Sequence, residues 1–150
     1  MGDRAADLSL SEASSQLLEE CRMVLPGIQT LLGFQLIAVF QRAFSELSPG
    51  ERQLHLAAVM CVVAAVALVM SPAVLHRSRQ PQRVSQRFVA VSSALLMWSM
   101  LPLAVGTSCD IYLVARLATD NRAESGVLAA LAVLIFAGLW VVFPKKVRLE

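Results

Sequence analysis

Four long runs of apolar residues, almost free of charge, decide what this chain can fold into. They extend over residues 24–40, 54–75, 88–109 and 126–143. A helix needs about 20 apolar residues to cross a bilayer core, and roughly 17–25 are tolerated. Each run is long enough, and none leaves the polar face that a helix of a soluble protein keeps. The four runs therefore predict a chain that crosses a membrane four times.

The composition agrees with this reading and excludes some partners. Hydrophobic residues make up 57% and charged residues 16% of the chain, against about 45–50% and about 25% in soluble domains. The net charge of +2 is too small to indicate nucleic-acid binding, and no aromatic residues alternate with the basic ones to stack bases. We therefore expect membrane lipid as a partner and no nucleic acid.

The motifs of common enzymes and metal sites are missing. The three cysteines, Cys21, Cys61 and Cys109, form no CxxC pair and so indicate neither a zinc site nor a disulfide framework. The chain has no HExxH, no GxSxG and no glycine-rich phosphate loop, the motifs that would indicate hydrolytic or phosphate chemistry. We expect a protein that is not an enzyme, with no cofactor and no metal.

Local patterns predict where the helices begin and end. In a capping box, Ser, Thr, Asp or Asn is followed three residues later by Glu or Gln, and the two answer the free amides of a helix start. Three pairs match: Ser9 with Glu12, Ser48 with Glu51, and Asn121 with Glu124. Pro144 follows the last run, where it would end a helix. We expect spans at about 24–42, 54–75, 88–110 and 124–143.

The segment before the first span is amphipathic. Its apolar residues recur at helical spacing over about 10–25, as Leu10, Ala13, Leu17, Cys21 and Val24. Pro26-Gly27 then predicts a bend where this helix meets the first span. The expected fold is all-α: one integral membrane domain over residues 1–150, a four-transmembrane-helix bundle with an amphipathic N-terminal helix.

The basic residues predict the orientation. Four spans place nine of them on one side: Arg4, Arg22, Arg77, Arg79, Arg83, Arg87, Lys145, Lys146 and Arg148. The other side receives Arg42, Arg52, Arg116 and Arg122. Basic residues concentrate on the cytoplasmic side, so both termini are expected in the cytoplasm. The basic stretch 76–87 either sets this topology or also holds anionic lipid headgroups.

A few polar residues lie in or near the apolar runs. Gln29 and Gln35 in the first run either bond to another helix or hold an ion or small solute. Asp110 lies about 33 Å along the helix from the start of the third run, so we expect it near the outer face with Glu51 and His55. Those three form either a proton or cation site or ordinary interfacial polarity. No charge is expected at mid-span.

A second group of charges is expected at the cytoplasmic face. The first two spans, joined by a short connection, should form an antiparallel hairpin. This would bring together the ends of the N-terminal helix and of the second span, with Glu19, Glu20, Arg22, His76 and Arg77. The cluster is either a structural staple or, through His76, a pH-responsive site.

Parts of the sequence resemble a known family. The segments carrying the resemblance are LLEECRMVLPGIQTLLGF (17–34), SPAVLHR (71–77) and residues 140–144. Together they resemble small bacterial membrane proteins of uncharacterised function, some labelled automatically as sodium:proton antiporters. The resemblance implies four helices in a bacterial inner membrane. The matching positions are Glu20, Arg22, Gly27, Gln29, Gly33, Pro72, His76 and Arg77.

Two functions remain open from the sequence. The first is a non-enzymatic component that works through helix packing, as a homo-oligomer or beside a larger membrane protein. The second is a small oligomeric ion or proton transporter, as the antiporter label implies. An ionisable side chain deep in the bundle would favour the transporter. Because we expect none at mid-depth, the sequence favours the packing component.

Overall fold

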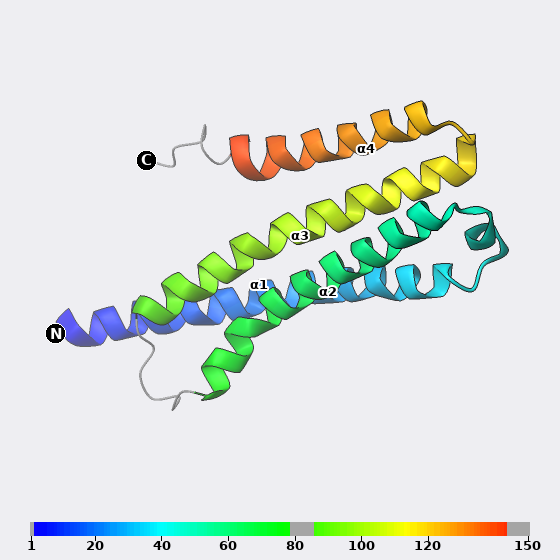
Figure 1. Cartoon of the computed structure of the whole chain (residues 1–150). Helices are drawn as coiled ribbons and strands as arrows, with labels where there is room; N and C mark the ends of the chain where they lie inside the picture. The colour runs from blue at the N-terminus through cyan, green and yellow to red at the C-terminus, as the bar shows by residue number, and fades with distance from the viewer. Residues whose placement is uncertain (1, 79–85, 144–150) are drawn as a thin grey trace.

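The computed structural model describes residues 2–78 and 86–143, and this part of the chain is helical almost throughout. The elements are α1 (Gly2–Ala38), η1 (Arg42–Glu46), α2 (Pro49–Ser78), α3 (Gln86–Thr119), α4 (Arg122–Ala137) and η2 (Gly138–Val142). The η1 segment is a 3₁₀ helix between α1 and α2, and η2 continues α4 as a π-helix. Figure 1 shows the four long helices. The predicted all-α, four-helix fold is confirmed.

All four helices are long and apolar enough to cross a membrane, over Glu12–Ala38, Pro49–Arg77, Gln86–Thr119 and Arg122–Val142. Their large apolar side chains point outward to an unusual degree: Phe34 is 67% exposed and Leu134 is 68% exposed. Ser92 and Ser99, by contrast, are fully buried. Apolar surface outside and small polar groups inside is the reverse of a soluble core. The chain is a multi-pass membrane protein.

The helix ends differ from the ends of the predicted spans, most at the end of α3. The third was expected to end near residue 110, but α3 continues to Thr119. The apolar run ended before the charged Asp110, so the prediction placed the end of the span there. In the structure Asp110 accepts a hydrogen bond from Gln35 on α1. Arg116, about two turns further on, is paired with Glu51 on α2, so the helix continues past both polar residues. The first span was expected to reach residue 42, but α1 ends at Ala38.

The N-terminal helix and the first span form one helix, α1, from Gly2 to Ala38, with Pro26 inside it; the bend expected at Pro26-Gly27 stays a prediction. Helix α1 also begins before Ser9, where the sequence predicted its N-terminal cap. A proline within a helix removes the hydrogen bond to the carbonyl four residues earlier, here that of Arg22. Arg22 and Pro26 both lie on the exposed side of α1, so the freed carbonyl is not trapped against another helix.

The other two caps form as predicted. At the start of α2, the Ser48 amide donates to Glu51 Oε2 at 2.9 Å and the Glu51 amide donates to Ser48 Oγ at 3.4 Å. At the start of α4, Asn121 Oδ1 accepts from the Ala123 amide at 2.9 Å, and its Nδ2 donates to Glu124 at 2.9 Å. Both caps fix a helix start directly after a connection.

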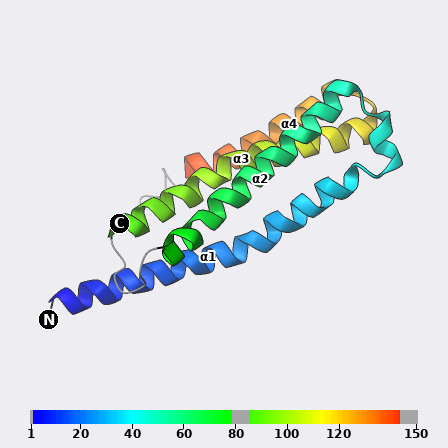
Figure 2. The ribbon, with the colours of Figure 1, turned by 60° about the horizontal axis from the view of Figure 1, so that its bottom comes forward.

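The helices run antiparallel, and α1, α2 and α3 enclose the core (Figures 1 and 2). The buried core residues are Cys21, Ile28, Val62, Val69 and Leu96. Helix α4 packs mainly against α3, on the side away from α1 in both views. The α1–α2 and α3–α4 connections lie together at one end, here called the hairpin end. The beginning of α1 and the end of η2 lie at the other.

Helices α2 and α3 approach most closely at Gly106. A Cβ atom there would lie 3.0 Å from Val62 Cγ2 and 3.1 Å from the Ala58 carbonyl oxygen. Ala58 and Val62 are themselves fully buried. Small residues at such a crossing let two backbones come together. This contact lies one helical turn from Asp110 on α3 and sets the spacing of the two helices next to the site described below.

Candidate polar site

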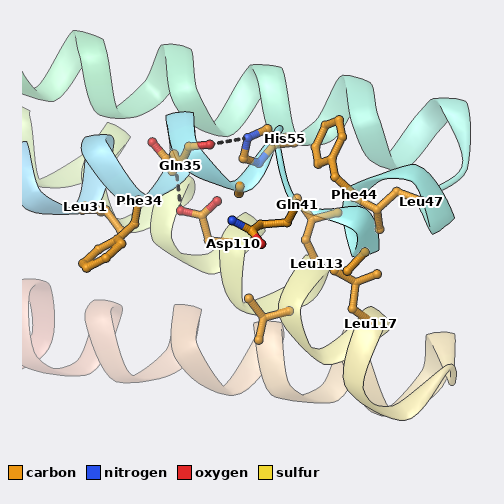
Figure 3. Close-up of a pocket in the computed structure, with 13 residues that line it drawn as sticks. Leu31, Phe34, Gln35, Gln41, Phe44, Leu47, His55, Asp110, Leu113 and Leu117 are labelled. Carbon is orange, nitrogen blue, oxygen red and sulfur yellow. Dashed lines mark hydrogen bonds between the residues drawn. The ribbon is translucent and has the colours of Figure 1, made fainter.

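A cavity of about 350 Å³ lies near the hairpin end, between α1, α3 and the segment that joins α1 to α2. Its wall is mostly apolar, with Leu31, Phe34, Phe44, Leu113, Val114 and Leu117 among its members. Four polar residues also line it: Gln35, Gln41, His55 and Asp110. Figure 3 shows the side chain of Gln41 extending towards Asp110. The cavity is therefore apolar along most of its wall and polar around Asp110.

Gln35 connects three helices in this site. Its Nε2 donates a hydrogen bond to Asp110 Oδ2 on α3 at 2.7 Å. Its backbone oxygen lies 3.0 Å from Nε2 of His55 on α2 (Figure 3). A carbonyl oxygen only accepts, so this bond requires His55 to carry a proton on Nε2. Gln35 and His55 are each only 4% exposed. The polar cluster Gln35–His55–Asp110 is thus built into the packing of α1, α2 and α3.

Asp110 lies further from the end of its helix than the sequence indicated. Counting from the start of the apolar run put it at the outer end of the third span. Because α3 continues to Thr119, Asp110 lies about 13 Å along the helix axis from that end. It lies about 9 Å along the same axis from Arg116. Its side chain faces α1 and the cavity rather than a loop. Its depth in a membrane stays a prediction.

Of the three residues predicted at the outer face, the structure brings two into one site. His55 and Asp110 both line the cavity. Glu51 lies one turn before His55 and instead forms an ion pair with Arg116, at 2.7 Å between Oε1 and Nε. Arg116 also reaches the exposed Asp120 at 3.3 Å. The sequence indicated Arg116 only as one of the charges that set the topology, and its pairing with Glu51 was not predicted.

The two glutamines predicted within the membrane have different surroundings. Gln29 is exposed on α1 and Gln35 is buried. Six residues separate them, which turns the helix by about 240° at 3.6 residues per turn. Only Gln35 faces the other helices. Its Oε1 is buried and, within the part of the chain described, accepts no hydrogen bond, an arrangement that costs free energy unless a donor is supplied.

The predicted cytoplasmic cluster lies at the other end of the bundle. Its members are Glu19, Glu20, Arg22, His76 and Arg77. The three residues on α1 are exposed, as is Arg77. The His76 ring contacts the ring of Phe88 edge to face, with centroids 5.8 Å apart. Among the side chains that the structure describes, no ion pair links the α1 members to His76 or Arg77. A role for this cluster stays a prediction.

Comparison with known proteins gives one match. No curated protein and no solved structure matches the chain. A family model described as a family of unknown function (DUF6328) matches residues 9–144. The matched range covers α1 from residue 9 onward, the other three helices, the cavity and every member of the polar cluster. It also agrees with the uncharacterised family expected from the sequence. The chain belongs to this family of unknown function.

Proposed function

We propose that this membrane protein binds a proton or a small cation at Asp110 and moves it as a small transporter. One observation carries the proposal: a carboxylate faces the inside of the bundle, beside a cavity, held by a buried amide from another helix. The sequence favoured a packing component because no ionisable side chain was expected at mid-depth. The cluster Gln35–His55–Asp110 supports the transporter instead, because it contains an ionisable side chain that contacts a buried residue of another helix.

The surroundings of Asp110 support this role. A carboxylate away from water is costly unless a positive charge or a proton balances it. The two ion pairs found in the described parts of the chain involve Glu51, Arg116 and Asp120, and neither includes Asp110. Its bond from Gln35 is that of a neutral amide. A bound proton or cation would supply the missing balance, and exchange between the two would couple them.

The direction of transport depends on the orientation. We propose that the chain lies in a bacterial inner membrane with both termini in the cytoplasm, because nine basic residues fall on that side and four on the other. The hairpin end and the cavity then face the outer half of the membrane. A reporter fused after Glu46 should read external, and reporters at residues 1 and 150 cytoplasmic. A cytoplasmic signal from the Glu46 fusion would reverse the assignment.

Flux measurements in vesicles test the transport proposal. The purified protein is reconstituted with a pH-sensitive dye trapped inside, a pH gradient is imposed, and sodium or potassium is added outside. We expect a cation-dependent pH change that falls about tenfold or more in Asp110→Asn. The control is Glu46→Gln, which changes an exposed carboxylate at the same end of the bundle and should leave the rate unchanged. Equal rates in wild type and Asp110→Asn would overturn the proposal.

A packing component remains the second candidate, and one observation favours it. Helix α4 packs mainly against α3 and exposes large apolar side chains along its length, including Val127, Leu131 and Leu134. A second copy or a larger membrane protein would fit such a face. Extraction from native membrane in mild detergent, followed by mass measurement, should then give a defined complex. Together with an absence of flux, this would make the packing role the better account.

A further inference from the structure

We propose that the cavity at Asp110 takes an amphiphilic amine, whose ammonium group meets the polar cluster and whose apolar body lies along the wall. This inference rests on the proposed function, because the same carboxylate binds the cation in both. It goes further by naming the chemical class of the ligand.

The polar part of the site offers acceptors for N–H groups. The Asp110 carboxylate uses one oxygen for the bond from Gln35 and has further acceptor capacity. Gln35 Oε1 is a second acceptor in the same cluster, without a donor among the described residues. The Nε2 of His55 is already directed at a backbone oxygen. A primary ammonium group carries a positive charge and three donors, which complements this arrangement.

The wall of the cavity is largely apolar, and an inorganic ion gains nothing from an apolar surface. Apart from the polar cluster and Gln41, the cavity is lined by aliphatic and aromatic side chains and by alanines. Its volume is at the lower end of the range for small-molecule sites, roughly 300–1,000 Å³. A bare or hydrated metal ion would leave these apolar side chains uncovered. A ring or a short alkyl chain would bury them and gain free energy in proportion to the area covered.

The position of the cavity gives an amphiphile access. Two of its wall residues, Phe34 on α1 and Val114 on α3, are 67% and 66% exposed. They therefore form part of the outer surface of the bundle, which faces lipid in a membrane-spanning protein. A molecule partitioned in the bilayer could enter between α1 and α3 without crossing the core.

The donor set argues against a transition metal. In residues 2–78 and 86–143, no three His, Cys, Asp or Glu side chains gather closely enough to hold a metal ion. Asp110 and His55 give at most two such groups, whereas zinc sites in proteins use three or four. An ammonium group needs no such coordination shell, because hydrogen bonds and one opposite charge are sufficient.

The test uses the full-length protein in lipid nanodiscs and three probes. Hexylammonium has both the charged head and the apolar body, methylammonium has only the head, and hexanol has only the body. We expect hexylammonium to raise the midpoint of thermal unfolding, with half-saturation at a concentration about tenfold or more below that of the other two. This shift should disappear in Asp110→Asn. Equal effects of hexylammonium and hexanol, or an undiminished shift in Asp110→Asn, would overturn the inference.

A second variant separates the amine site from the cation site. Val114→Trp adds bulk at the cavity wall, while Val127→Trp makes the same change on α4 at a residue of equal exposure, 67% against 66%. We expect Val114→Trp to abolish the hexylammonium shift and Val127→Trp to keep it. Failure of hexylammonium to act on a protein whose sodium or potassium flux needs Asp110 would refute the amine and leave the proposed function standing. If the wild-type protein shows neither the hexylammonium shift nor a flux that needs Asp110, both the amine site and the proposed function are refuted.

Discussion

Two polar groups lie near the hairpin end, and they are built differently. The ion pair Glu51–Arg116 joins α2 to α3 at 2.7 Å, with opposite charges matched and a second carboxylate, Asp120, at its exposed edge. The cluster Gln35–His55–Asp110 lies deeper, and it holds one carboxylate beside a neutral amide and an acceptor without a donor. In the ion pair, the positive charge and the carboxylate satisfy each other. The polar cluster still has a carboxylate without an opposite charge and an acceptor without a donor, which is expected of a site that binds a ligand.

The crossing of α2 and α3 supports both groups, so disturbing it should have the largest effect. In Gly106→Val, the new side chain meets Val62 Cγ2 and the Ala58 carbonyl, and overpacking of this kind costs about 1–3 kcal/mol. Thermal unfolding should show this loss, and the amine response should weaken with it. Gly126→Val on α4 meets nothing within 4 Å and should stay close to wild type. Equal loss in both variants would show that the crossing is not tight.

The ion pair should matter for stability and little for binding. Arg116→Leu leaves the carboxylate of Glu51 without its partner, which is worse than removing both charges. We expect the unfolding midpoint to fall by roughly 5 °C, with the amine still bound. Adding Glu51→Gln in the same chain should recover part of the loss. If the double variant is no more stable than Arg116→Leu, the pair is not what holds α2 and α3 at this level.

The polar cluster should matter for ligand binding and little for stability. In Gln35→Leu/Asp110→Leu, the hydrogen bond and the unpaired acceptor disappear together, and apolar groups of similar size replace them. Such a change is close to neutral in stability, within about 1 kcal/mol. His55 keeps its bond, because its partner is the backbone oxygen of residue 35. We expect normal unfolding without ligand and no response to hexylammonium. A large loss of stability would assign the cluster a structural role.

The smallest effect is expected at the opposite end. Glu20 and Arg77 are both exposed, and exposed ion pairs contribute little. Arg77→Glu should leave the unfolding midpoint unchanged within error, and so should Glu20→Arg/Arg77→Glu. A clear loss in the single variant that is rescued in the double one would show that these two residues meet. It would then confirm the predicted cytoplasmic cluster as a structural element.

The sequence predicted the fold well because lipid imposes a simple requirement. Uninterrupted apolar runs identified four helices, and the caps at Ser48 and Asn121 marked two of their starts correctly. It misplaced the end of α3 because Asp110 looked like the edge of a span, although its carboxylate accepts a hydrogen bond from Gln35 on α1. Local patterns carry no information about such a partner.

The site was only partly predictable for the same reason. Gln35, His55 and Asp110 were each singled out, but Gln35 was grouped with Gln29, and Asp110 with Glu51. Which of them meet depends on the rotation of α1 and on the register of α2 against α3. Gly106 at their crossing sets the distance between α2 and α3, and a single sequence does not reveal that contact.

The central claim is that Asp110 exchanges a proton for a cation, and infrared difference spectroscopy tests it most directly. Spectra of the protein in nanodiscs are compared before and after addition of sodium or hexylammonium. We predict loss of a protonated carboxyl band with gain of carboxylate bands, and absence of this change in Asp110→Asn. An unchanged carboxyl region on saturation with either cation, or the same change in Asp110→Asn, would contradict the account.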